Sequence, residues 1–315
     1  MEYNLDDIIK NSKKILLLSH VNPDGDTLGS MCAMYSMILK RFKKKVDMNV
    51  VSNIPFNYKF LPNIEFAQRY LDTSLLYDLV ITLDVAAIDR VRDSKIFFDK
   101  AKCTVNIDHH KTNPAYAVYN LIDPEASSCG EVLFNYFKKH GWEITSDASI
   151  CLYTAIMTDT GNFRFDNTSA SSLHAAADLV EMGVNPSKLY KYCYESKTKN
   201  LVLFQNHCVN KAVFLNDNKI AYTLVYKKDL EKFNAGEDYT DGIAETLRAI
   251  DSTEVSFVVK EVESKISKVS MRSKKIDVAK ICEKFGGGGH TLAAGCTIKA
   301  SVSDSVEKLL REIKL

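Results

Sequence analysis

The sequence predicts a two-domain α/β protein, with a parallel-sheet domain first and a smaller α+β domain second. Short apolar runs alternate with amphipathic helical patterns in the first half, which is typical of strands and helices that wind into a parallel sheet. After Asn216 the pattern changes to alternating runs, two of which resemble a hairpin. We therefore expect a first domain over 1–184, a helical linker over 185–213 and a second domain over 214–315.

The first domain begins with the apolar run KKILLL, which ends in a polar cluster as a buried parallel strand does. A helix follows, because Leu28, Met31 and Tyr35 fall on one stripe. The same two patterns recur along the domain. Strands are predicted at 13–18, 46–51, 79–83 and 104–107, and helices at 26–43, 128–140, 146–157 and 169–182.

Gly183 to Pro186 breaks this alternation, and helical patterns with apolar stripes continue to residue 212. The second domain then shows strand patterns at 220–226, 255–262 and 266–271, the last two joined as a hairpin around 263–265. Helical patterns cover 240–250, 276–285 and 302–314. The run Gly286–Gly289 follows the second of these helices.

Composition is that of a folded protein, with 46% hydrophobic and 26% charged residues. The net charge of +1 divides unevenly, since residues 1–185 carry −4 and residues 186–315 carry +5. No apolar stretch is long enough for a membrane span, and the acidic start does not resemble a signal peptide. The eight cysteines are scattered without a C-x-x-C pair, which favours reduced thiols in a cytoplasmic protein.

Acidic residues and histidines gather where the predicted strands of the first domain end. They are His20, Asp24 and Asp26 after the first strand, Asp84 after the third, Asp108, His109 and His110 after the fourth, and Asp159 at a helix end. Open α/β sheets bind ligands at this edge. Four converging carboxylates would repel one another unless two divalent cations offset their charge. Mixed His and Asp ligands favour a first-row transition metal such as Mn²⁺, and paired metals are a recurrent hydrolytic device.

Each of these residues also has a purely structural interpretation. An aspartate after a strand is commonly a turn former or a helix N-cap, and Asp26 fits that role for the helix it precedes. The glycine run also has two interpretations. It is either a flexible linker or a stretch of backbone whose N–H groups bind an anion. Arg272 and His290 flank the run and would add charge-assisted contacts to phosphate, which favours the second interpretation.

Taken in order, these segments resemble the motifs of the DHH phosphoesterase family, named for the triplet that stands here as Asp108-His109-His110. The second half resembles the DHH-associated substrate domain in the stretch MRSKKIDVAKICEKFGGGGHTLAAG. Length and motif layout are most similar to the NrnA type, stand-alone enzymes that degrade very short RNA and dephosphorylate 3′-phosphoadenosine 5′-phosphate (pAp). The resemblance covers nearly the whole chain.

The resemblance implies a role for each matching residue. One metal ion would be bound by His20, Asp24 and Asp84, and the other by Asp26, Asp84, His109 and Asp159. Asp84 would bridge the two ions, Asp108 would support the ligands, and His110 would contact the scissile phosphate. In the second domain, the substrate-binding residues would be Arg272, Ser273, Gly287, Gly288, Gly289 and His290.

The expected cofactors are two divalent metal ions. Mn²⁺ is the preferred ion, with Mg²⁺ or Co²⁺ as alternatives. The expected partners are short single-stranded RNA and small nucleotides such as pAp and pApA, with no membrane. A homodimer is compatible with the sequence, which does not determine the oligomeric state. Two other functions stay open, namely a soluble cyclic-di-AMP or pApA phosphodiesterase and a nucleotide-binding regulator without catalysis.

Overall fold

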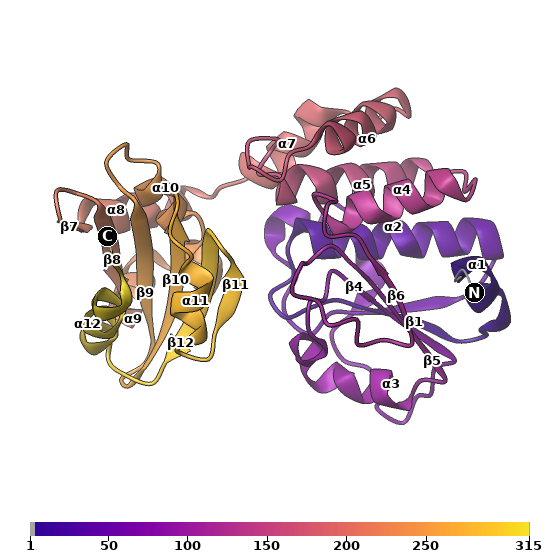
Figure 1. Cartoon of the computed structure of the whole chain (residues 1–315), viewed down its shortest axis with the longest axis horizontal. Helices are drawn as coiled ribbons and strands as arrows, with labels where there is room; N and C mark the ends of the chain where they lie inside the picture. Colours follow the sequence, from indigo (N-terminus) through magenta and orange to yellow (C-terminus); the bar gives the residue numbers. More distant parts are fainter. Residues whose placement is uncertain (1–3, 315) are drawn as a thin grey trace. The chain divides into compact units, whose positions relative to one another are not determined.

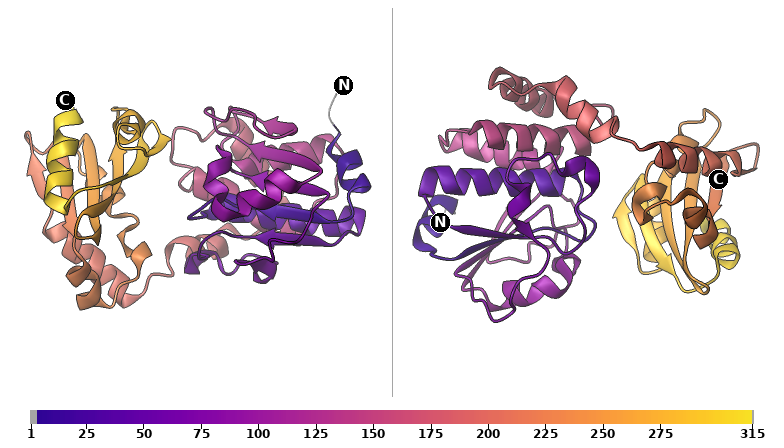
Figure 2. Two further views of the ribbon diagram at one scale, coloured as in Figure 1. Left: turned by 90° about the horizontal axis from the view of Figure 1, so that it is seen from below. Right: turned by 180° about the vertical axis from the view of Figure 1, so that it is seen from behind.

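The computed structural model describes residues 4–314 and divides the chain into two compact units, Met1–Ser196 and Lys197–Leu315 (Figures 1 and 2). The two helices of the expected linker fall on different sides of this division. Helix α7 (Pro186–Tyr194) belongs to the first unit, and α8 (Lys199–Asn210) belongs to the second. Over residues 4–314, none of the helices combines the length and apolar character that crossing a membrane requires.

A six-stranded parallel sheet forms the first unit, with the order β3-β2-β1-β4-β5-β6. The strands are β1 (Ile15–Leu18), β2 (Val46–Asn49), β3 (Ala67–Gln68), β4 (Leu79–Leu83), β5 (Cys103–Asp108) and β6 (Tyr119–Ile122). The chain winds outward in opposite directions from β1 and β4, so their carboxyl ends flank a topological switch point. The four predicted strands are present, which confirms the α/β class. The two edge strands were missed because they are short and lack an apolar run.

Helices cover both faces of this sheet (Figure 1). One face packs against α2 (Gly25–Phe42), α4 (Cys129–Lys139) and α5 (Ser146–Asp159), with α1 (Leu5–Asn11) and α6 (Ala170–Glu181) beside them. The other face packs against η3 (Ile88–Ser94) and α3 (Lys95–Lys100), and the 3-10 turns η1 (Phe56–Tyr58) and η2 (Ile64–Phe66) lie in the connection from β2 to β3. Strand β1 is buried along its whole length, because Ile15 and Leu17 enter one core and Leu16 and Leu18 the other.

Side-chain caps fix where the helices of the site begin. Asp24 caps α2 by accepting a hydrogen bond from the Thr27 amide over 3.0 Å. Asp26 is therefore not the N-cap, as one interpretation of the sequence had it, but lies inside the first turn and is buried. Ser128 caps α4 in the same way and accepts from the Glu131 amide over 3.0 Å.

The second unit is a mixed six-stranded sheet with the order β11-β12-β10-β9-β8-β7. Its strands are β7 (Val213–Leu215), β8 (Ile220–Val225), β9 (Val255–Glu263), β10 (Ile266–Ser273), β11 (Gly288–His290) and β12 (Ala293–Ile298). One face packs against α8, α9 (Lys227–Phe233) and α10 (Ile243–Arg248), with the 3-10 turn η4 (Glu237–Thr240) nearby, and the other against α11 (Val278–Glu283) and α12 (Val302–Glu312). The predicted hairpin is β9–β10.

The last residues of the glycine run form an edge strand, which neither interpretation of the sequence had included. Gly288 and Gly289 belong to β11 and pair with Gly295 and Ala294 of β12. Neither strand was predicted, since glycine has low β propensity and no side chain with which to show alternation.

Candidate active site

The structure gathers the eight acidic and histidine residues singled out in the first unit at the carboxyl edge of its sheet. Three groups have ligand atoms that all lie within 4.8 Å of one another. They are His20 with Asp24 and Asp84, Asp26 with His109 and Asp159, and Asp84 with Asp108, His109 and His110. The groups share Asp84 and His109, so they form one continuous cluster.

Asp84 lies at the centre of this cluster in a strained backbone conformation, with φ at 57°. Its Oδ2 accepts a hydrogen bond from Thr27 Oγ1 over 2.5 Å and lies 3.3 Å from His20 Nε2. Its Oδ1 is buried and has no hydrogen-bond partner among residues 4–314. A buried carboxylate oxygen without such a partner is costly, and a cation bound there would remove the cost.

His109 faces three carboxylates with one ring nitrogen. Its Nε2 lies 3.6 to 3.7 Å from oxygens of Asp26, Asp84 and Asp159. Its Nδ1 lies 3.3 Å from the Ala126 carbonyl oxygen. When Nδ1 donates to that carbonyl, Nε2 keeps its lone pair toward the carboxylates, which is the form of histidine that binds metals.

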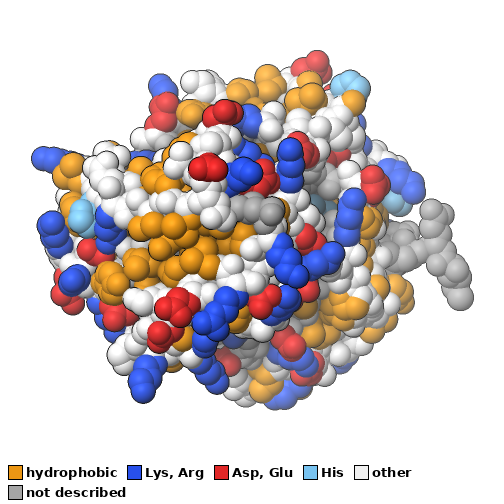
Figure 3. All heavy atoms as spheres, turned by 60° about the vertical axis from the view of Figure 1, so that its left-hand side comes forward, with side chains coloured by type: hydrophobic (Ala, Val, Ile, Leu, Met, Phe, Trp, Pro, Cys, Tyr) orange, Lys and Arg blue, Asp and Glu red, His pale blue; other side chains and the backbone are white. Residues whose placement is uncertain are grey.

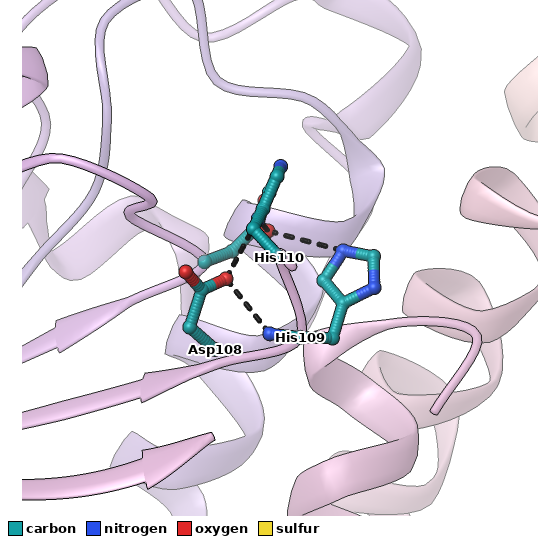
Figure 4. Close-up of side chains that lie close together, drawn as sticks. Asp108, His109 and His110 are labelled. Carbon is teal, nitrogen blue, oxygen red and sulfur yellow. Dashed lines mark hydrogen bonds and ion pairs between the residues drawn. The ribbon is translucent and has the colours of Figure 1, made fainter. Parts of the chain in front are cut away.

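Asp108 holds both histidines of the triplet in place (Figure 4). Its Oδ1 accepts a hydrogen bond from the His109 backbone amide over 2.8 Å and lies 2.7 Å from His110 Nδ1. Its Oδ2 accepts from the Asn113 side chain over 2.5 Å. Burial lowers the pKa of His110, but the hydrogen bond with Asp108 and the charges of Asp84 and Asp108 outweigh it and raise the pKa to about 9. The raised pKa favours the protonated form of His110.

The carboxylates of the cluster repel one another strongly. Burial, together with the charges of neighbouring aspartates, raises the pKa of Asp26 and of Asp159 well above the usual range. Burial acts in the same direction on Asp84, but the hydrogen bond with His20 and the nearby imidazoles lower its pKa. Such a cluster takes up protons or cations to balance its charge. The mixed nitrogen and oxygen donors and the orphaned Asp84 oxygen fit divalent metal ions.

Asp26 is anchored on the first turn of α4. Its Oδ2 accepts a hydrogen bond from the Cys129 amide over 2.8 Å, and its Oδ1 accepts from the Gly130 amide over 2.9 Å. Amides in the first turn of a helix have no partner within the helix, and the helix dipole favours a negative charge there. A side chain from the start of α2 is thus fixed by a helix about a hundred residues later in the chain.

In the second unit, Arg272 and His290 lie in one row across three strands. Arg272 of β10 and His290 of β11 both pair with Ala293 of β12, which lies between them. Residues paired in this way point to the same face of a sheet. The Arg272 guanidinium donates to Glu245 over 2.7 Å and to the Met271 carbonyl over 2.8 Å, so a ligand would have to share it with these partners.

The other residues expected to bind substrate have structural roles as well. Ser273 is buried, and its hydroxyl oxygen accepts from the amides of Lys275 and Ile276. A Cβ at Gly287 would lie 2.2 Å from the Gly295 carbonyl oxygen, and one at Gly289 would lie 2.5 Å from the Ala293 carbonyl oxygen. Both glycines are therefore required by the approach of β12, whereas a Cβ at Gly288 would meet open space.

Charge is mixed on the face shown in Figure 3, where basic and acidic side chains are interspersed around apolar ones. The positive surplus of the second half is not gathered there into a single patch. This face therefore offers an anionic ligand individual basic side chains rather than a broad basic surface.

Two family models match this chain. Residues 14–156 match the N-terminal domain of the DHH family, and residues 217–315 match the DHHA1 domain. The chain belongs to the DHH family. The cluster described above lies in and just beyond the DHH segment, and Arg272, the glycines and His290 lie in the DHHA1 segment.

Several proteins resemble this DHH-family chain over nearly its whole length. The bifunctional oligoribonuclease and PAP phosphatase NrnA of Bacillus subtilis is 28% identical over 95% of this chain and 93% of its own. The protein of the same name from Thermus thermophilus is 28% identical over 95% of this chain and 89% of its own. The cyclic-di-AMP phosphodiesterase PdeA of Listeria monocytogenes is 23% identical over 97% of this chain but only 48% of its own.

The fold is also found in a solved structure. A crystal structure of an exopolyphosphatase-related protein from Bacteroides fragilis superposes with a TM-score of 0.90 at 23% identity. The match covers 97% of this chain and 93% of that one. It shows that the DHH-family chain has the same fold.

The sequence did not single out several residues whose side chains contact the cluster, among them Thr27, Asn113, Asn167 and Arg90. Thr27 donates to Asp84, and Asn113 donates to Asp108. Asn167 donates from its side chain to Asp159 over 3.2 Å, and Arg90 lies 3.2 Å from a ring nitrogen of His20. Thr27 and Asn113 stand close to the motifs in sequence, and that proximity was the only available signal. Polar residues in loops carry no periodicity from which a role can be predicted.

Proposed function

We propose that this chain is a metal-dependent phosphoesterase that hydrolyses short oligoribonucleotides to mononucleotides and pAp to AMP. The observation that carries the proposal is the buried Asp84 Oδ1, which has no hydrogen-bond partner within residues 4–314 and faces His109. Structural carboxylates in protein interiors are hydrogen-bonded, so this oxygen is better suited to a cation. Membership of the DHH family and the names of the relatives from Bacillus and Thermus support the choice of reaction.

The residues that would hold the metal ions are those expected from the sequence. His20, Asp24 and Asp84 would form one site, and Asp26, Asp84, His109 and Asp159 the other. Two Mn²⁺ ions would lower the pKa of bound water and offset charge on the phosphate oxygens. Mn²⁺ is preferred because the donors combine imidazole and carboxylate, with Mg²⁺ or Co²⁺ as alternatives.

The protein's own groups would orient and protonate the substrate. Asp108 Oδ1 contacts both the His110 ring and the His109 backbone amide, which orients the His110 ring before substrate arrives. His110, with its pKa raised to about 9, would donate a hydrogen bond to a phosphate oxygen and stabilise the charge that develops there. Loss of Asp108 would remove the hydrogen bond that orients His110 and would lower the pKa of its ring.

The second unit would bind the rest of the substrate. Arg272 offers a fork suited to phosphate, and His290 lies on the same sheet face two strands away. Gly288 leaves open space on β11, where a ligand can approach the backbone. Ser273 would hold the turn that follows Arg272, with Gly287 and Gly289 keeping β11 against β12.

A substrate panel in the presence of Mn²⁺ tests the proposal. The panel contains pAp, pApA, RNA of two to five nucleotides, cyclic-di-AMP and pyrophosphate. We expect release of phosphate from pAp and of mononucleotides from the short RNAs, and neither reaction after chelation of the metal. A chain that binds these compounds but releases no product would instead be a nucleotide-binding regulator.

A second candidate function is hydrolysis of cyclic-di-AMP or its linear product pApA. The observation that favours it is the similarity of the whole chain to about half of the Listeria enzyme. Cyclic-di-AMP turnover faster than turnover of pAp and of short RNA would decide for this alternative.

A further inference from the structure

Arg90 lies at the edge of the cluster, in a segment that the backbone holds firmly. The residue belongs to η3, which follows β4. Its carbonyl oxygen accepts a hydrogen bond from the Val21 amide over 2.9 Å, which ties η3 to the loop after β1. Its own amide donates to the Ala87 carbonyl over 3.0 Å. The backbone of Arg90 is thus fixed at the switch point between β1 and β4.

Arg90 is half-buried beside His20 of the cluster, yet its guanidinium forms no ion pair with a carboxylate of the described residues. Among residues 4–314, no carboxylate oxygen lies within 4.0 Å of its nitrogens. Two other arginines do pair with carboxylates, since Arg41 and Arg272 each lie 2.7 Å from a carboxylate oxygen. A guanidinium has five N–H donors and cannot lose its charge in a protein, so those donors need an acceptor.

Among the described residues, one side chain contacts Arg90, and this contact does not occupy these donors. Its Nη2 lies 3.2 Å from His20 Nδ1. The same Nδ1 lies 2.8 Å from the Val21 carbonyl oxygen, to which it donates when Nε2 is the unprotonated nitrogen that would hold a metal ion. A protonated Nδ1 cannot also accept from Arg90. In that form of His20 the guanidinium is available for a ligand.

The charge of Arg90 reaches both sides of the cluster. Burial and this charge both lower the pKa of His20 and of His110, although nearby carboxylates raise each pKa overall. The contact with the ring nitrogen places Arg90 beside His20, a proposed ligand of the first metal ion.

We propose that Arg90 binds a non-bridging oxygen of the phosphate group that enters the cluster, and so acts as a substrate-binding residue of the first unit. The proposal rests on the proposed function, because a phosphoester substrate is what brings phosphate to this position. A guanidinium fork held at the edge of the cluster is suited to binding phosphate oxygens.

Binding of AMP and adenosine to the full-length chain at saturating Mn²⁺ tests this, with calorimetry as the readout. We expect Arg90→Gln to raise the Kd for AMP about tenfold or more, since hydrogen bonds between charged groups are lost. The Kd for adenosine should be unchanged, and Arg90→Lys should fall between the wild type and Arg90→Gln. Arg92→Gln is the matched control, because it removes the same charge from an exposed residue of the same segment.

Mn²⁺ binding, followed by electron paramagnetic resonance, separates this role from a structural one. The proposal expects Arg90→Gln to bind Mn²⁺ as the wild type does. Weaker Mn²⁺ binding with an unchanged Kd for AMP would overturn it, and so would a wild-type chain that binds AMP no more tightly than adenosine. Tight AMP binding through Arg90 without turnover of pAp or short RNA would contradict the proposed function alone.

Discussion

The Gly130 amide donates a hydrogen bond to Asp26 Oδ1 over 2.9 Å, so a proposed metal ligand at the start of α2 depends on how closely α4 approaches. That approach is possible because residue 130 has no side chain. A Cβ there would lie 2.4 Å from the Ala155 Cβ of α5 and 3.6 Å from Asp26 Oδ1. Helix packing and ligand placement are therefore linked at this one position.

We expect Gly130→Ala to weaken metal binding, because the added methyl group pushes the first turn of α4 away from Asp26. Calorimetric titration with Mn²⁺ should show about a tenfold or greater loss of affinity, while the circular dichroism spectrum stays unchanged. Adding Ala155→Gly removes the methyl group that the new side chain meets and should restore part of the affinity, at a helix cost of about 1 kcal/mol. Equal affinity in Gly130→Ala and the wild type would show that the contact is unimportant.

Asp84→Asn should abolish both Mn²⁺ binding and hydrolysis of pAp. Asparagine tolerates the left-handed backbone found at this position, so the fold is retained while the negative charge at the centre of the cluster is lost. Activity and metal content of the purified variant check this. Asp89→Asn, at an exposed residue in the following turn, is the matched control and should behave as the wild type. Turnover by Asp84→Asn at the wild-type rate would exclude the metal assignment.

Arg272→Ala should raise the KM for pAp about tenfold and change kcat little, because the side chain is expected to bind the substrate far from the reacting atoms. Steady-state kinetics over a range of pAp concentrations measure both constants. Arg248→Ala removes the same charge from α10 and serves as the control. If KM were unchanged in Arg272→Ala, the binding residue of the second unit would have to be sought elsewhere.

Asp78 should make the first unit less stable at low pH. Hydrogen bonds from the Lys102 side chain and from the Lys14 and Lys13 amides lower its pKa to about 2. A carboxylate whose folded pKa lies below its unfolded value contributes stability above about pH 4, and this contribution is lost as the pH falls toward 2.

We therefore expect Asp78→Asn to lower the free energy of unfolding by about 1 kcal/mol at pH 7 and by less at pH 3. Urea unfolding followed by fluorescence of Trp142, the single tryptophan, reports on the first unit alone. Asp93→Asn, at an exposed residue, should give no such pH dependence. A difference that stays constant from pH 7 to pH 3 would contradict the role of Asp78.

Local patterns in the sequence predicted most of the elements near the site. Strand β4 runs from Leu79 to Leu83 as expected, and Asp84 follows it. The glycine run was harder to interpret from sequence. The close approach of β12 requires glycine at 287 and 289, whatever the run binds. Edge strands such as β6 depend on their neighbour for their hydrogen bonds, so four residues of sequence carry little signal.

The sequence by itself determined the alternation of strands and helices, the edge of the sheet at which the aspartates and histidines would meet, and the balance of carboxylate and imidazole donors. Only the tertiary structure decided which atoms face one another. Arg90 approaches His20 across 70 residues, and Gly130 holds Asp26 across 104. The physical reason is that hydrophobic periodicity fixes which face of a local element is buried. The positions of loop side chains depend instead on strand order and helix packing, which bring distant segments together.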